Sequence, residues 1–180
     1  MMKIETSHII LDACCILNLS ASGNLLEILA AIPARVAVSQ VVKQEELKTL
    51  PGPEKELEAA IAQGLLVVVD FESEEEEITY INYAVDLDDG ESATGAIAVC
   101  RGWAIATDDK GAKSFFAREV PNLQVVSTLE MVKHWSETVE LELSALRDVL
   151  LSIRVKGRYM PRKNHPLRDW WEMRIKPPPG

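Results

Sequence analysis

Cysteine is scarce in this sequence, and the spacings in which cysteine and histidine bind zinc do not occur. The 180 residues contain three cysteines, and two of them, Cys14 and Cys15, are adjacent. An odd number of cysteines suits no simple disulfide framework, so we expect reduced thiols and a cytoplasmic protein. The sequence has neither a CxxC nor an HxxxH spacing, and a structural zinc site is therefore not expected.

Long apolar runs are also missing. No apolar stretch reaches the roughly 18 residues that a membrane-spanning helix requires. The start, MMKIETSHIILDACC, lacks the basic segment followed by a long apolar segment that marks a signal peptide. We expect no contact with a membrane. Apolar residues still make up 47% of the chain, which is enough for one domain with a substantial core.

Positive charge is rare in most of the chain and concentrated at its end. Residues 1–146 contain 10 Lys and Arg against 25 Asp and Glu, a net charge of −15. Residues 147–180 contain 9 against 3, a net charge of +6. A uniformly acidic protein would argue against a polyanionic partner, but an acidic body with a basic tail does not.

Apolar strand patterns alternate with helical patterns along most of the chain, which predicts an α/β fold with a central, mainly parallel sheet. The segment 65–71 is nearly all apolar, and we expect it to be a strand buried on both faces. The expected strands are 8–12, 35–39, 65–71, 103–107 and 123–127. The expected helices are 13–23, 24–32, 40–50, 51–64, 73–87, 88–102, 109–120, 127–137 and 138–155.

Acidic residues follow or flank several of these strands. Asp12 ends the first strand, Asp108 and Asp109 end the fourth, and Glu91 opens the helix before it. Ligand sites in such sheets form outside the carboxyl ends of the strands. Carboxylates that converge there repel one another, at roughly 4 kcal/mol for a pair ~4 Å apart. A hard cation such as Mg²⁺ or Mn²⁺ would relieve that repulsion.

Four segments in this order resemble the acidic motifs of PIN-domain ribonucleases: IILDACCILNLSASG, VSQVVKQEEL, LDDGESATGAIAV and AIATDDKGAK. The resemblance covers about residues 7–135 and is nearest to the subgroup with a Gly-Glu pair, which is related to VapC-type toxins. It implies an α/β/α sandwich and Mg²⁺- or Mn²⁺-dependent cleavage of RNA. It also implies a homodimer and, for toxins, a small antitoxin partner. Carried over, the motif acids are the catalytic Asp12, Glu45, Glu91 and Asp109, with Asp12, Glu91, Asp108 and Asp109 as metal ligands.

Two positions depart from the family pattern. Cys14 stands where the family usually has Ser, Thr or Asn, and a thiol is a poor ligand for a hard cation. Glu45 and Glu46 are adjacent, so only one of them can face the site. The thiol motivates an alternative function, a PIN-like module that binds RNA or protein without cutting. Phosphoryl transfer on an aspartate ranks lower, because Cys14 replaces the second aspartate that the related phosphatases need.

The basic end of the chain is predicted to form a unit of its own. We expect a PIN-like domain over residues 1–137 and a helical and basic extension over 138–180. Cations and aromatic rings together suit single-stranded RNA, which they bind through phosphates and bases. One alternative is that its tryptophans dock on the acidic body or on a neighbouring chain, and another is that the tail covers the acidic site. The predicted RNA-binding residues are Arg154, Lys156, Arg158, Arg162, Lys163 and Trp170.

Overall fold

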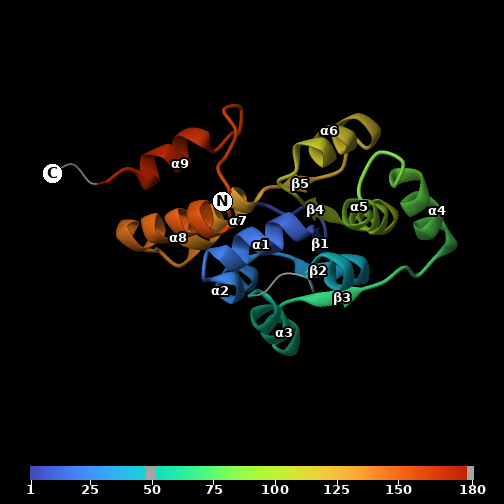
Figure 1. Ribbon diagram of the computed structural model, residues 1–180, viewed down its shortest axis with the longest axis horizontal. Coiled ribbons are helices and arrows are strands. Elements are labelled where there is room, and N and C mark those ends of the chain that lie inside the picture. The colour runs from blue at the N-terminus through green and yellow to red at the C-terminus, as the bar shows by residue number, and fades with distance from the viewer. Residues whose placement is uncertain (48–51, 178–180) are drawn as a thin grey trace.

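A five-stranded, all-parallel sheet forms the centre of the protein (Figure 1). The computed structural model describes residues 1–47 and 52–177, except the side chains of Glu45 and Glu46. The strands follow the spatial order β3-β2-β1-β4-β5. Their bounds are β1 (His8–Leu11), β2 (Arg35–Ser39), β3 (Val67–Val69), β4 (Ala104–Ala106) and β5 (Val125–Val126).

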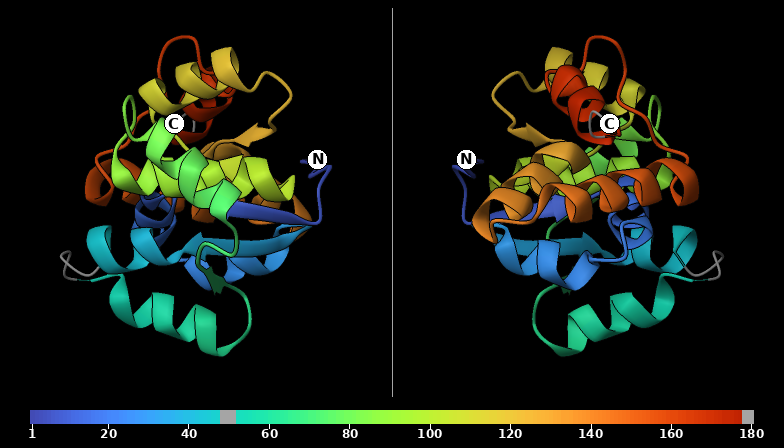
Figure 2. Two further views of the ribbon diagram at one scale, coloured as in Figure 1. Left: turned by 90° about the vertical axis from the view of Figure 1, so that its right-hand side faces the viewer. Right: turned by 90° about the vertical axis from the view of Figure 1, so that its left-hand side faces the viewer.

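Helices cover both faces of the sheet, because alternate strand residues supply two separate cores. Ile9 and Leu11 point into the larger core, whereas Ile10 lies in the smaller one. The two views of Figure 2 show opposite faces, with α4 and α5 in front in one and α7 and α8 in front in the other. The larger core packs α1 (Ala13–Ala21), α2 (Leu25–Ala31), α3 (Glu54–Ala62), α7 (Thr128–Thr138) and α8 (Leu143–Lys156). On the opposite face lie α5 (Asp89–Arg101) and α6 (Lys110–Glu119), with α4 (Glu74–Tyr83) packed on α5. The predicted α/β fold with a central parallel sheet is therefore confirmed.

The prediction that the third strand is buried on both faces is wrong. β3 is an edge strand that pairs only with β2, and the side chain of Val67 is 46% exposed. Part of the apolar run 65–71 is buried outside the strand, because Leu66, one residue before β3, enters the larger core.

Two helical segments also differ from expectation. In the described part of the expected helix 40–50 the chain forms the π-helical turn η1 (Val42–Glu46), and residues 48–50 lie outside the described residues. The Val42 amide donates to Ser39 Oγ at 3.1 Å. The expected helix 138–155 begins only at Leu143, since Glu140 has a left-handed φ of 50° that separates α7 from α8. The tail contains a further helix that was not expected, α9 (Arg168–Ile175), and its Trp171 is fully buried in the larger core.

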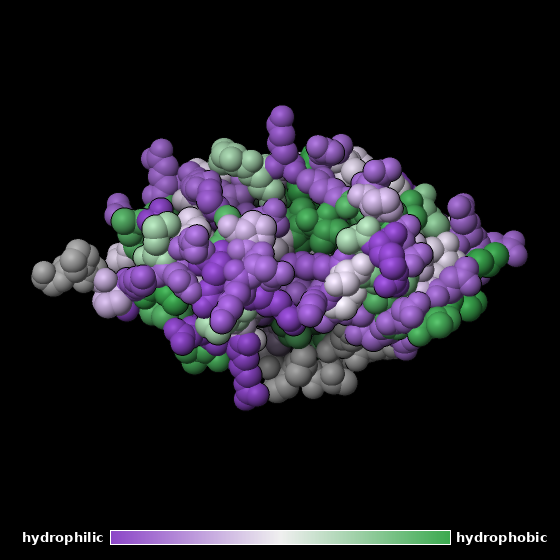
Figure 3. Space-filling model, turned by 90° about the horizontal axis from the view of Figure 1, so that it is seen from above, coloured by the Kyte–Doolittle hydropathy of each residue, from purple (hydrophilic) through white to green (hydrophobic). Residues whose placement is uncertain are grey.

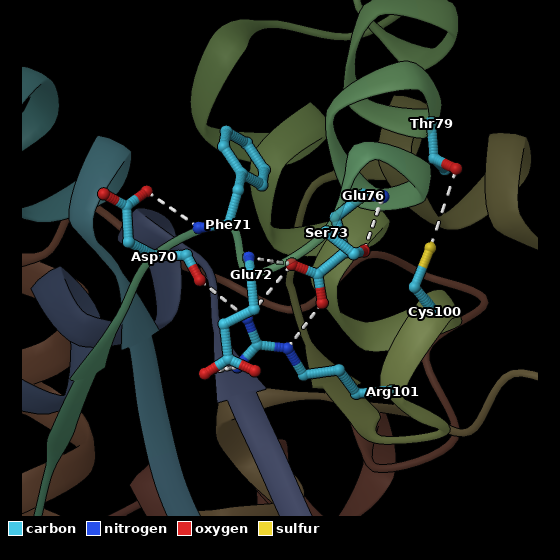
Figure 4. Close-up of polar contacts among 8 residues, drawn as sticks. All are labelled: Asp70, Phe71, Glu72, Ser73, Glu76, Thr79, Cys100 and Arg101. Carbon is cyan, nitrogen blue, oxygen red and sulfur yellow. Dashed lines mark hydrogen bonds and ion pairs between the residues drawn. The ribbon is translucent and has the colours of Figure 1, made fainter.

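A charged cluster fastens α4 to α5 and to the segment after β3 (Figure 4). Arg101 donates from Nε to Glu76 Oε1 at 2.6 Å and from Nη2 to the Asp70 carbonyl at 2.6 Å. Glu76 Oε2 accepts the Glu72 amide at 2.7 Å, and the residue is 3% exposed. The hydrogen bond from Arg101 is the main reason that the pKa of Glu76 lies below its ordinary value. The buried Glu76 is therefore paired with a cation of the protein itself, while the side chain of Glu72, 3.5 Å from Arg101 Nη1, stays 74% exposed.

The chain reverses its direction of travel across the sheet between β1 and β4. It moves outward from β1 to β2 and β3, and then crosses to β4 on the other side of β1. Leu11 at the end of β1 pairs with Ala106 at the end of β4. The residues that follow, Asp12 and Thr107, are therefore brought together at the point where such folds bind ligands.

Among the described helices, no single one has both the length and the apolarity to cross a bilayer; α1 and α2 satisfy that test only as a pair bent by 119°.

Candidate active site

Asp12 is a buried carboxylate at the end of the central strand and at the start of α1. It is 4% exposed. Its Oδ1 accepts the Ala13 amide at 2.8 Å, and its Oδ2 accepts the Thr107 hydroxyl at 3.1 Å. Burial raises the pKa of Asp12, and these two hydrogen bonds oppose that rise. These two hydrogen bonds hold the carboxylate in one orientation.

Thr107 joins the ends of the two central strands. Its hydroxyl donates to Asp12 and accepts the Asp109 amide at 3.2 Å. Asp109 then begins α6, where its Oδ1 accepts the Ala112 amide at 2.8 Å. Thr107 itself is fully buried. One hydroxyl therefore sets the position of Asp109 relative to Asp12.

Glu91 approaches the same place from the first turn of α5. It forms a reciprocal cap with Asp88, whose Oδ1 accepts the Glu91 amide at 2.8 Å. The pKa of Glu91 is raised to about 7, first by burial and then by repulsion from Asp88, Asp109 and Asp12. These interactions show that the carboxylates of Asp12, Asp88, Glu91 and Asp109 share one region and repel one another.

Asp108 serves a different purpose from its neighbour. Its Oδ2 accepts Asn18 Nδ2 at 2.9 Å and the Thr128 hydroxyl, and its Oδ1 accepts the Thr128 amide at 3.0 Å. The carboxylate therefore connects α1 to the start of α7. Asp12 also has protein donors on both oxygens, but the side-chain donors of Asp108 come from two helices, through Asn18 of α1 and Thr128 of α7.

Among the described residues, the potential metal ligands whose atoms lie within 4.8 Å of one another are Cys14, Cys15 and Asp108, and not Asp12, Glu91 and Asp109. Two thiols favour a soft metal ion rather than Mg²⁺, and the carboxylate of Asp108 is already hydrogen-bonded. Cys14 Sγ lies 3.5 Å from Asp12 Oδ2 and 3.6 Å from Thr107 Oγ1. Thr107 thus supplies Asp12 with a hydroxyl donor, which Cys14 does not.

The second-motif glutamate falls outside the described side chains. Glu45 and Glu46 lie on η1, which contacts α5. The placement of the Glu45 carboxylate, and the choice between it and Glu46, therefore stay predictions.

The predicted RNA-binding residues occupy three different places. Arg158 and Arg162 line a pocket of about 600 Å³, and Lys163 lines an adjoining pocket of about 440 Å³ that Arg162 shares. Arg154 and Lys156 are exposed in the last turn of α8. Trp170 is half-buried against the larger core, so part of its ring surface is already covered.

The acidic group fits a hard divalent cation by the chemistry of its donors. Asp12, Glu91 and Asp109 supply carboxylate oxygens only, and their repulsion disfavours the fully ionised state in the absence of a cation. Sequence reasoning missed Asp88 and Thr107. The spacing of Asp88 and Glu91, an N-cap residue followed by Glu three residues later, was the available signal for Asp88. Thr107 carried no signal beyond its place after a strand.

The fold and the site together define a class of protein: an α/β sandwich with a parallel sheet and an acidic site where the strand order reverses. The chain matches a family model described as a PIN domain (DUF3368) over residues 8–165. It therefore belongs to the PIN-domain family, whose members are generally nucleases that use divalent metal ions. The match extends through α8 as far as His165. No curated protein matches the chain.

Proposed function

We propose that this protein is a Mg²⁺- or Mn²⁺-dependent endoribonuclease that cleaves single-stranded or structured RNA. The observation that carries the proposal is the unbalanced group of carboxylates at the switch point, where repulsion and burial raise the pKa of Glu91 to about 7. A site that needs a cation and lies beside basic pocket residues suits a polyanionic substrate.

Each residue has a proposed role. Asp12, Glu91 and Asp109 hold the ion, with Glu45 completing the site or orienting the attacking water. A bound divalent ion supplies a nucleophilic water at neutral pH and stabilises charge on the phosphodiester. Thr107 positions the carboxylate of Asp12 and the backbone of Asp109. The basic residues of the extension bind the RNA strand.

The first test is cleavage of a mixed single-stranded RNA pool by the purified protein with Mn²⁺, Mg²⁺ or EDTA. We expect cleavage that requires metal and falls at least about a hundredfold in Asp12→Asn, because one ligand is lost from a shared ion. Asp148→Asn, which removes an exposed carboxylate on α8, is the matched control and should leave cleavage unchanged. Wild-type cleavage by Asp12→Asn would refute the assignment.

The alternative function is a PIN-like module that binds RNA or protein without turnover. The thiol of Cys14, a weak donor 3.5 Å from Asp12 Oδ2, favours it. This alternative predicts that the protein retains RNA on a filter with no metal-dependent cleavage. Calorimetry with Mn²⁺ separates the two, because an inactive module need not bind the ion.

On the resemblance alone, we also propose that the protein acts as the toxin of a toxin–antitoxin pair, as a homodimer in the cytoplasm. The free thiols of Cys14 and Cys15 agree with a reducing compartment. Growth arrest on expression that Asp12→Asn abolishes would support the toxin role. Light scattering that gives the monomer mass would refute the homodimer.

A further inference from the structure

A pocket of about 600 Å³ opens directly beside the acidic site. Cys14 and Asp109 form its border with the site, and the loop between α8 and α9 forms the opposite wall. Seen from above in Figure 3, the face that carries α6, α9 and this loop is mostly hydrophilic. The volume lies within the range of sites that hold a small-molecule group such as one nucleotide. Leu17, Met160 and Pro166 add apolar walls against which a base can pack.

Four cationic side chains line this pocket: Lys110 and Lys113 from α6, and Arg158 and Arg162 from the loop. Within residues 1–47 and 52–177, none of the four forms a salt bridge or a side-chain hydrogen bond. The chain has a net charge of −9, so partners for cations are plentiful elsewhere. Asp108, the other acid of the lining, is already engaged by Asn18 and Thr128. The positive charge of the pocket is therefore available to an anionic ligand.

The backbone at Arg158 is held in a conformation that arginine disfavours. Its φ is 51°, in the left-handed region where glycine is preferred. A Cβ on the preceding Gly157 would lie 2.7 Å from the Ile153 carbonyl of α8 and, because the glycine packs closely on α1, 2.9 Å from Asn18 Oδ1. The following Tyr159 contacts Trp171 edge to face, with ring centroids 6.1 Å apart. These two anchors force the turn at position 158 and present the arginine at the pocket.

His165 also lines the pocket, and burial followed by the charge of Lys113 lowers its pKa. The Leu167 amide donates to His165 Nδ1 at 3.0 Å, so the ring proton lies on Nε2. The backbone of the loop is closed by the His165 amide, which donates to the Arg162 carbonyl at 3.0 Å, and by Arg168, which donates to the Pro161 carbonyl. These hydrogen bonds fix the conformation of the loop, which places Arg158 and Arg162 in the lining of one cavity.

We propose that this pocket is a nucleotide subsite for single-stranded RNA, in which Lys110, Lys113, Arg158 and Arg162 bind the phosphates next to the one that is cleaved. The subsite rests on the proposed RNA substrate but not on cleavage itself. The strained arginine has a function in this arrangement, because glycine would satisfy the backbone at position 158 but would bind no phosphate.

The test measures binding separately from cleavage. Fluorescence anisotropy with a short labelled single-stranded RNA is recorded over a salt series, using the full chain with Asp12→Asn and EDTA present. Loss of one phosphate contact should lower the slope of log K against log[salt] by about 0.7, which is roughly fivefold in affinity at 0.1 M salt. Arg158→Gly should show this loss while its urea midpoint stays equal or rises, since glycine relieves the left-handed strain. Arg162→Ala should show the same loss of affinity.

Two controls isolate the subsite. Lys55→Ala removes an exposed cation from α3, next to the other edge of the sheet, and should leave affinity unchanged. Glu140→Gly relieves the other left-handed residue, beyond the end of α7, and should raise the midpoint without loss of RNA affinity.

Unchanged RNA affinity in Arg158→Gly and Arg162→Ala would overturn the proposal, as would an Asp12→Asn parent that binds no RNA. If the expected losses appear but wild type never cleaves RNA, the subsite stands and the nuclease assignment fails.

Discussion

Two acidic clusters in this protein, at Glu76 and at Glu91, differ in whether the protein balances their charge. Glu76 is 3% exposed and bonded by Arg101 at 2.6 Å, and its pKa is lowered. Glu91 faces Asp88, Asp109 and Asp12 instead, and its pKa is raised to about 7. The first cluster ties α4 to α5, and the second lies where the sheet order reverses. A carboxylate that the fold pairs with its own cation stabilises structure, whereas carboxylates left unpaired together point to a ligand.

The largest effect is expected from breaking the balanced cluster. Arg101→Ala leaves the buried Glu76 carboxylate without its cation, and should lower the free energy of unfolding by about 3–5 kcal/mol. Urea denaturation measures this. The double variant Arg101→Ala, Glu76→Ala should recover part of the loss, because the unpaired charge is removed as well. A midpoint in Arg101→Ala equal to the parent's would show that the pair contributes nothing to stability.

The next effect concerns the residue that joins the unbalanced carboxylates. Thr107→Val keeps the side-chain shape but removes the hydroxyl that donates to Asp12. We expect Mn²⁺ affinity, measured by calorimetry, to fall about 10- to 100-fold, as is typical for loss of a group that orients a metal ligand. Thr79→Val, which loses a hydroxyl 3.6 Å from Cys100 Sγ in the other region, should leave Mn²⁺ affinity unchanged. Equal affinity in both variants would refute the role of Thr107.

The two clusters should also respond to pH in opposite directions. The lowered pKa of Glu76 means that its stabilisation is present above the ordinary pKa near 4.5 and is lost as pH falls through the folded value. The raised pKa of Glu91 means that its contribution is full below about 4.5 and is lost as pH rises through about 7. Urea denaturation in EDTA should therefore show the stability of Glu91→Gln, relative to the parent, rising over that range.

The matching Glu76→Gln variant should lose stability relative to the parent as pH rises. Added Mn²⁺ should reverse the loss at Glu91 in the parent and leave the Glu76 comparison unchanged. If the stabilities of Glu91→Gln and Glu76→Gln relative to the parent changed with pH in the same direction, the proposed difference in charge balance between the two clusters would be refuted.

The smallest effect is expected at Cys14. Cys14→Ser replaces a weak donor near Asp12 with a stronger one, and should raise Mn²⁺ affinity by roughly two- to fivefold, or about 0.5–1 kcal/mol. Inhibition by Cd²⁺ should weaken, because one soft ligand of the Cys14–Cys15 pair is lost. Cys100→Ser is the matched control and should change neither property. A fall in Mn²⁺ affinity in Cys14→Ser would contradict this account of the thiol.

Much of the fold follows from local pattern. The strands were expected near their observed positions because short apolar runs between helical patterns are a local property. Ser73 and Ser127 cap α4 and α7 through their own hydroxyls, which accept amides three residues later. The burial of the third strand was misjudged because an edge position depends on strand order. α9 was missed because its helix depends on Trp171 docking in a core built by distant residues.

The candidate site was predictable in part. The order of acidic motifs placed Asp12, Glu91 and Asp109 in one region, because carboxyl ends of parallel strands share an edge. The sequence does not distinguish the adjacent Asp108 and Asp109, and the structure places one on Thr128 and the other at the start of α6. Asp88 and Thr107 came to light only through the electrostatics and hydrogen bonds of the folded site.

The sequence by itself determined the alternating elements, the family and the acidic motifs, because these depend on residue type and on spacing along the chain. Tertiary structure alone decided which carboxylates are balanced. Arg101 and Glu76 are 25 residues apart yet form a pair, whereas Asp88 and Glu91 lie near Asp12 and are repelled by it. It also bent the chain at Arg158 to place cations beside the site. Charge balance and backbone strain depend on distances between remote segments, and only the folded chain sets those distances.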